Sequence, residues 1–91
     1  MATRHSIDMC LFNCEDALQY ADEQYMEGAR QEHGNDLEYT QAQNMLEQAI
    51  HEIDVLWNSA DNQQRERLYR MRLLVDQMQN QMILRSNTRT M

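Results

Sequence analysis

Apolar residues recur along the chain at alternating intervals of three and four positions in three successive stretches, which is the spacing of amphipathic helices that pack together. The apolar positions are Ile7, Leu11, Cys14, Leu18, Ala21, Tyr25 and Gly28 in the first stretch; Tyr39, Ala42, Leu46, Ala49, Ile53 and Leu56 in the second; and Leu68, Met71, Val75, Met78 and Met82, with Leu74 alongside, in the third. The pattern predicts helices over about residues 6–32, 36–58 and 61–85.

Residues that favour helix ends mark the boundary between the first two stretches. Ser6 is the expected N-cap of the first helix, and Gly34 stands where a helix closes in the left-handed region. Asn35 follows as an expected N-cap, with Glu38 three residues later, which is the spacing of a capping box.

The second boundary has two interpretations. Residues 58–62 are rich in cap-forming side chains, so we expect a break there, with Ser59 or Asp61 capping the third helix. The alternative is that the second and third helices are continuous, because the apolar positions from 46 to 71 also fit a period close to 11 residues. In that case the second and third helices form one long helix, and the protein is a long helical hairpin that dimerises. Residues 86–91 show no periodicity and are expected to form a flexible tail.

Three helices with broad apolar stripes predict an all-α, antiparallel three-helix bundle with heptad-like packing, in a single domain of residues 1–85. Charge supports this arrangement, since residues 1–58 hold twelve acids and two arginines, whereas residues 59–91 hold three acids and six arginines. The third helix is therefore expected to pair with the acidic first two. We expect its basic cluster to be used for internal ion pairs; the cluster is Arg65, Arg67, Arg70 and Arg72.

Composition narrows the classes of function. The chain has 91 residues, a net charge of −7, two glycines, no proline and no lysine. The acidic balance argues against nucleic acid and anionic membranes as partners, and the absence of lysine removes Schiff-base chemistry. No apolar run approaches the roughly 20 residues that span a bilayer, and the first residues lack the apolar stretch of a secretory signal. We expect a cytoplasmic protein.

The chemistry-bearing side chains form no recognisable site. Cys10 and Cys14 share a helix face, and His5 and His51 could lie near the same end of the bundle, which makes a zinc site with two cysteines and two histidines conceivable. His51 falls on an outward-facing position, however, and Cys14 occupies a core position where free cysteine behaves as a small apolar residue. The chain has no Glu-x-x-His pair of the di-iron bundles. We expect no metal, no cofactor and no enzymatic activity.

Three apolar residues outside the stripes are the best candidates for a functional surface. Phe12, Tyr69 and Leu73 are not needed to close the bundle, and the bundle would carry all three toward one end. Arg65 and Arg72 flank them, and aromatic residues with arginine are typical of interfaces. We expect this patch to mediate homo-oligomerisation or the docking of a protein partner. The alternative is a small ligand- or metal-responsive regulator that uses Cys10 and Cys14.

Three segments also carry a resemblance: the opening Met-Ala-Thr-Arg, the hinge Gln31-Glu32-His33-Gly34-Asn35-Asp36, and the stretch from Leu56 through Gln63-Gln64-Arg65 to Leu84. Together they resemble a family of short, uncharacterised cytoplasmic proteins from Bacillus-like Firmicutes, over nearly all of residues 1–84. The resemblance implies a small helical protein of spore-forming bacteria. It brings no catalytic motif and no site residues.

Overall fold

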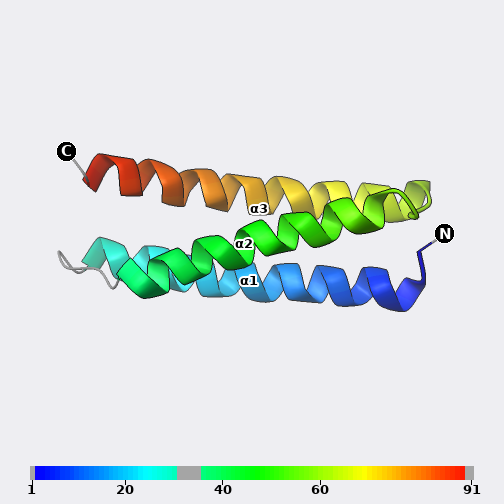
Figure 1. Ribbon diagram of the computed structural model, residues 1–91, viewed down its shortest axis with the longest axis horizontal. Helices are drawn as coiled ribbons and strands as arrows, with labels where there is room; N and C mark the ends of the chain where they lie inside the picture. The colour runs from blue at the N-terminus through cyan, green and yellow to red at the C-terminus, as the bar shows by residue number, and fades with distance from the viewer. Residues whose placement is uncertain (1, 31–35, 90–91) are drawn as a thin grey trace.

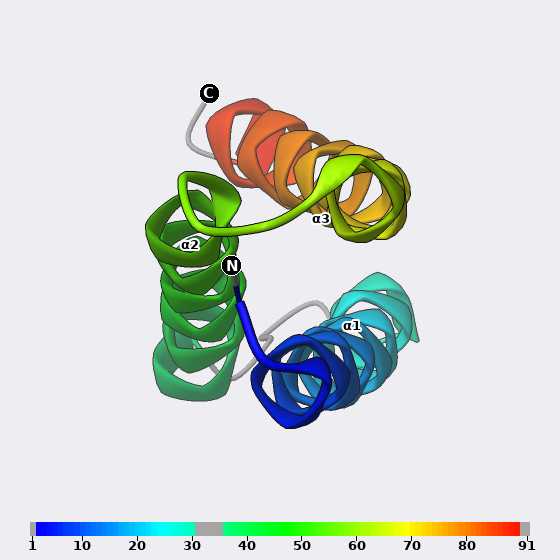
Figure 2. The same cartoon turned by 90° about the vertical axis from the view of Figure 1, so that its right-hand side faces the viewer.

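The computed structural model describes residues 2–30 and 36–89, which form three helices running up, down and up (Figure 1). These are α1 (Arg4–Arg30), α2 (Asp36–Trp57) and α3 (Asn62–Arg89). Seen end-on, they stand at the corners of a triangle (Figure 2). The bundle measures 47 × 20 × 15 Å. The all-α three-helix bundle is confirmed, and the alternative of one continuous second and third helix is wrong.

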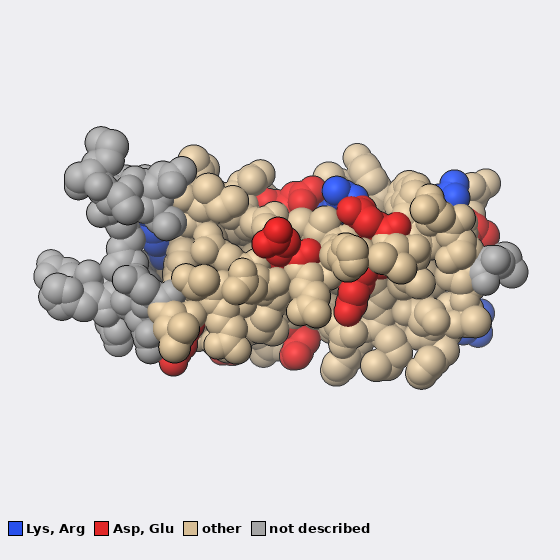
Figure 3. Space-filling model, in the orientation of Figure 1, with Lys and Arg blue, Asp and Glu red and all other residues tan. Residues whose placement is uncertain are grey.

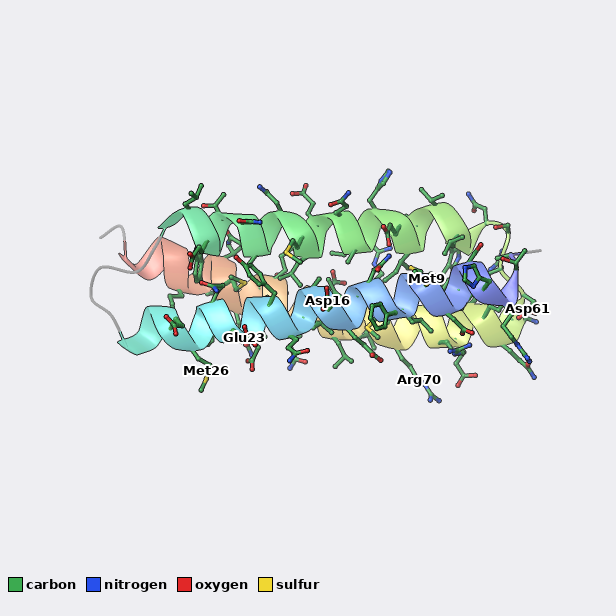
Figure 4. All side chains as sticks on the ribbon, turned by 90° about the horizontal axis from the view of Figure 1, so that it is seen from below. Met9, Asp16, Glu23, Met26, Asp61 and Arg70 are labelled. Atoms are coloured by element: carbon green, nitrogen blue, oxygen red, sulfur yellow. The ribbon has the colours of Figure 1, made fainter. Side chains whose placement is uncertain are left out.

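The turn between α2 and α3 explains why the helix breaks there. The Gln64 amide N–H donates to the Asp61 carboxylate at 2.8 Å, and the Asp61 amide N–H donates to the Gln64 side-chain oxygen at 2.9 Å. This reciprocal pair is a capping box, and it satisfies backbone donors that would otherwise lack partners at the start of α3. Asp61, shown at one end of the bundle in Figure 4, is therefore the cap of α3, as one of the two predicted candidates.

The start of α1 differs from expectation, because Thr3 and not Ser6 is the N-cap. The Ser6 amide N–H donates to the Thr3 hydroxyl at 3.0 Å, so Ser6 already lies inside the first turn. The preceding residue closes the end of the bundle. Ala2 is buried, its amide N–H donates to the Ser59 carbonyl, and its carbonyl accepts a 3.0 Å bond from the Gln64 side chain. These contacts favour a helix that begins two residues earlier than predicted.

The far end of the bundle adds a second correction. α3 continues to Arg89, so residues 86–89, expected in a flexible tail, are helical. Extending an existing helix fixes one residue per new hydrogen bond and needs no new nucleus, and no glycine or proline interrupts this segment. The predicted caps Gly34 and Asn35 lie outside the described residues, as do residues 90 and 91.

The core follows the predicted stripes of α2 and α3, but the buried face of α1 is rotated from its predicted stripe. Cys10 and Ala17 are buried, whereas Leu11 and Leu18 are only half-buried. Cys10 and Ala17 lie on the side of α1 that borders α2, whereas Leu11 lies on the side that borders α3. Small buried side chains characterise α1 and α2, which we call the alanine seam: Ala17, Ala21, Ala42 and Ala49.

Two contacts fix how α3 lies along α1. Asp8 pairs with Arg67 at 3.2 Å, and the guanidinium of Arg85 stacks on the Tyr25 ring, 3.5 Å from its centroid. The first pair is separated by 59 positions, and the hydrogen bond from Arg85 to the Tyr25 carbonyl spans 60. Because this offset is nearly constant, α1 and α3 run parallel, in register, over most of their length.

Candidate interaction surface

All three apolar residues proposed from the sequence are exposed. The exposed fractions are 62% for Phe12, 53% for Tyr69 and 50% for Leu73. Large apolar side chains that the fold leaves in water are informative only when they gather in one place. Whether Phe12, Tyr69 and Leu73 form one functional surface therefore depends on whether they lie close together.

Phe12 lies in a groove between α1 and α3, which we call the Phe12 groove. Its volume is about 470 Å³, and it is lined by Asp8, Leu11, Phe12 and Glu15 of α1 and by Arg67, Arg70, Met71 and Leu74 of α3. Met71 is buried and Leu11 half-buried beneath it, whereas Leu74 is 51% exposed. The groove therefore has an apolar floor, with an exposed apolar side chain contributed by each helix.

Arg65 and Arg72, expected to flank the patch, face α2 instead. The Arg65 side chain donates to the Trp57 carbonyl at 2.9 Å, and its guanidinium lies 5.6 Å from the centroid of the Trp57 ring. Arg72 forms an ion pair with Asp54 of α2. Neither arginine lines the Phe12 groove, so both belong to the packing of α3 on α2.

Tyr69 and Leu73 lie on the side of α3 nearer these arginines. Residues four apart share a helix face, so Leu73 lies one turn beyond Tyr69, and Tyr69 one turn beyond Arg65. Neither Tyr69 nor Leu73 lines the Phe12 groove. The structure thus does not bring the five proposed residues together. Phe12 lies in the groove, Arg65 and Arg72 face α2, and Tyr69 and Leu73 are exposed on α3 outside the groove.

The predicted internal use of the basic cluster is confirmed for two of its members. Arg67 reaches Asp8 of α1 and Arg72 reaches Asp54 of α2. Arg70 pairs only within its own helix, with Glu66 at 2.7 Å, and its side chain is 75% exposed. In Figure 4 it points away from the bundle. Ion pairs this exposed contribute ~0–1 kcal/mol each, so they orient the helices more than they stabilise them.

Leu74, which the spacing places alongside the core stripe of α3, is a member of the groove that the sequence did not identify. It is 51% exposed. Its position three residues after buried Met71 and one before buried Val75 puts it at the edge of the stripe. The parallel register of α1 and α3 would have identified Leu74 as part of the groove, because it sets Leu74 beside Glu15 and one turn from Phe12.

The two thiols form a buried pair inside α1. Both cysteines are free and buried, and they are joined by a side-chain hydrogen bond. That bond raises the pKa of Cys14 far above its ordinary range, and burial raises it further. The same bond lowers the pKa of Cys10, against the opposing effects of burial and of nearby Glu52. This interaction therefore favours the protonated form of the Cys14 thiol.

Cys10 also borders a pocket between α1 and α2, of about 300 Å³, which we call the Cys10 pocket. Its other lining residues are Ser6, Met9, Asn13, His51, Glu52, Val55 and Leu56.

The histidines considered for a zinc site, His5 and His51, are both exposed. Within residues 2–30 and 36–89, no three side chains of histidine, cysteine, aspartate or glutamate come together in a way that could hold a metal ion.

Two further observations concern the surface. Acidic side chains gather in the middle of the face that α2 crosses, where basic ones are few (Figure 3). Over the part of the chain that the structure describes, none of the helices is both long enough and apolar enough to cross a membrane.

Comparison with known proteins places the chain in a family. Residues 1–84 match the model of a family described as "Protein of unknown function (DUF2524)". A relative in Bacillus subtilis (strain 168), "Uncharacterized protein YtzC", is 51% identical over 84 residues, which cover 92% of this chain and 93% of the relative. No solved structure gives a significant match. This three-helix bundle, with its exposed Phe12 groove, belongs to the DUF2524 family.

Proposed function

We propose that this protein is a non-enzymatic helical protein of the cytoplasm that acts by binding another protein chain. The observation that supports this most is the Phe12 groove, where Phe12 and Leu74 expose apolar surface from two different helices over an apolar floor. Aromatic, methionine and arginine side chains together are enriched in protein interfaces and in their hot spots.

Charge supports a protein partner over nucleic acid. The chain carries a net charge of −7, and two arginines of its basic cluster already pair with acids of α1 and α2. Binding to a phosphate backbone needs several uncommitted basic side chains on one surface. The acidic face that α2 crosses would instead repel such a ligand (Figure 3).

The test compares the two exposed apolar surfaces directly. One double variant, Phe12→Gln with Leu74→Gln, removes the apolar side chains of the groove, and a matched one, Tyr69→Gln with Leu73→Gln, removes those of the other surface. Light scattering reports self-association, and affinity capture from a cytoplasmic extract reports partners. We expect the groove variant to lose association and the matched variant to keep it, with unchanged circular dichroism in both. Loss only in the Tyr69 and Leu73 variant would move the function to that surface.

A ligand-responsive role of the thiols is a second candidate, favoured by the Cys10 pocket. The pocket brings Cys10 to the edge of an open, partly apolar space, while Cys14 holds it by a hydrogen bond. Cys10→Ser and Cys14→Ser variants, compared with the unaltered protein for bound metal and for thermal shift with small thiol-reactive compounds, test this role. A response that survives both substitutions would exclude it.

A further inference from the structure

The charges around the Phe12 groove are sorted by helix. The α1 rim carries the acids Asp8 and Glu15, and the α3 rim carries Arg67 and Arg70. One acid and one arginine are joined across the groove, since Asp8 pairs with Arg67 at 3.2 Å. Glu15 and Arg70 form no such bridge, because Arg70 turns to Glu66 of its own helix. The apolar centre of the groove therefore remains uncovered between an acidic rim and a basic rim.

A surface with one acidic and one basic rim complements a copy of itself in a particular orientation. Because α1 and α3 run parallel and in register, a two-fold axis along the groove would set α1 of each molecule against α3 of the other at the same height. Each acidic rim would then face a basic rim. A two-fold axis perpendicular to the helices would instead set α1 against α1, with acids opposite acids, which is unfavourable.

We propose that the Phe12 groove binds a second copy of this chain, in a dimer whose two-fold axis runs parallel to the helices. Isologous contacts of this kind are the commonest in soluble oligomers. Phe12 and Leu74 of both copies meet at the centre of the interface, and Glu15 of each copy lies within reach of Arg70 of the other, at the rim. The inference rests on the proposed function and names the occupant of its surface.

The dimensions of the bundle are sufficient for such a contact. A stable interface buries roughly 800 Å² on each partner, and the bundle offers a face 47 Å long. An apolar centre surrounded by charged residues is the usual anatomy of an interface, in which the rim charges decide which partner and which orientation are accepted.

A charge exchange tests both the occupant and the orientation. The single interface of the dimer contains the Glu15–Arg70 contact twice; in Glu15→Arg both contacts would set arginine against Arg70, and in Arg70→Glu both would set glutamate against Glu15. Each variant alone should dissociate at least about tenfold more readily than the unaltered protein. An equimolar mixture of the two should recover a heterodimer, because one contact then pairs the introduced arginine with the introduced glutamate, and the other is the unaltered pair of Glu15 with Arg70. Sedimentation velocity on each sample measures this.

Two substitutions of the same charge outside the groove serve as controls. Glu47→Arg on α2 matches Glu15→Arg, and Arg4→Glu matches Arg70→Glu; residues 4 and 47 are exposed and do not line the groove. We expect neither to change association. Thermal melts verify that all variants fold.

Three results would overturn the inference. The first is an unaltered protein that remains monomeric at all concentrations, and the second is a mixture that fails to restore the dimer. The third is a dimer that is indifferent to Phe12→Gln. If the unaltered protein is monomeric but captures a different protein, and Phe12→Gln abolishes that capture, the groove belongs to another partner. In that case the inference fails while the proposed function stands.

Discussion

The hydroxyl of Tyr39 donates a 2.7 Å hydrogen bond to the backbone carbonyl of Met82, 43 positions away in the sequence. Both residues are buried, so the bond links the first turns of α2 to the C-terminal half of α3 away from solvent. A buried hydroxyl needs such a partner to offset the loss of its water. The bond therefore sets the relative height of α2 and α3 at this end of the bundle.

Replacing Tyr39 by phenylalanine removes this bond and keeps the ring. We expect the free energy of unfolding to fall by about 0.5–1.5 kcal/mol, the net contribution of a typical hydrogen bond. Urea denaturation followed by circular dichroism measures the change. Tyr69→Phe is the matched control, since Tyr69 is exposed, and it should change stability little. Equal effects of the two substitutions would contradict the role of Tyr39.

Core substitutions should separate fully buried from half-buried positions. Ile53→Ala and Leu68→Ala each remove a fully buried side chain and should cost about 2–5 kcal/mol. Leu18→Ala should cost less, because Leu18 is only half-buried in α1. Chemical denaturation is again the measurement, with the exposed Gln77→Ala as control. A cost for Leu18→Ala equal to that of Ile53→Ala would place α1 in a different rotation.

The capping box at the start of α3 gives a prediction about the turn. Asp61→Ala removes the acceptor for the Gln64 amide and should destabilise the protein by about 0.5–2 kcal/mol. Asp61→Asn keeps a cap-forming side chain without the charge and should lose much less. Thermal melts of both variants, with Gln63→Ala as control, distinguish the cap from a general effect of the turn. Similar melting temperatures for alanine and asparagine would contradict the capping role.

The thiol pair predicts a loss of stability in alkali. The pKa of Cys14 is raised in the folded protein above its ordinary value of 9.0, so its contribution to stability is complete below that pH. As the pH rises past this value, the unfolded chain releases the proton that the folded chain keeps, and stability falls. The lowered pKa of Cys10 acts in the opposite direction, and its contribution is complete above pH 9.0.

Thermal melts between pH 9.0, the ordinary thiol value, and about pH 11 test this. The unaltered protein should lose stability more steeply than Cys14→Ser, in which the serine hydroxyl can still donate to Cys10 without titrating. Parallel slopes in the two proteins would mean that the thiol of Cys14 is not held protonated by the fold.

The number and type of the helices could be predicted from the sequence, because the stripes and the cap-forming residues agree at residues 58–62. The capping box of Asp61 and Gln64 begins a new helix at this point, which excludes one continuous helix through α2 and α3. The exact start of α1 could not be predicted, since it depends on Ala2 docking against Ser59 and Gln64, which are close only after folding.

The surface was predicted only in part. Helical spacing correctly identified Phe12, Tyr69 and Leu73 as side chains outside the core. Spacing alone does not fix the rotation of each helix about its own axis, because a helix in a triangular bundle buries a broad face against two neighbours. That rotation carries Arg65 and Arg72 toward α2 and brings Leu74, not Tyr69, to the groove of Phe12.

The alanine seam makes the two halves of this bundle differ mechanically. Alanine has no side-chain torsion to adjust, so a small separation of α1 from α2 breaks the contacts of Ala17, Ala21, Ala42 and Ala49 together. α3 instead presents Met71, Met78 and Met82 to the core, and methionine can change rotamer and keep contact as its helix shifts. We therefore expect α1 and α2 to shift as one unit, and α3 to adjust more readily against them. A partner that binds across α1 and α3 therefore contacts one helix of the α1–α2 pair and the helix that packs against that pair.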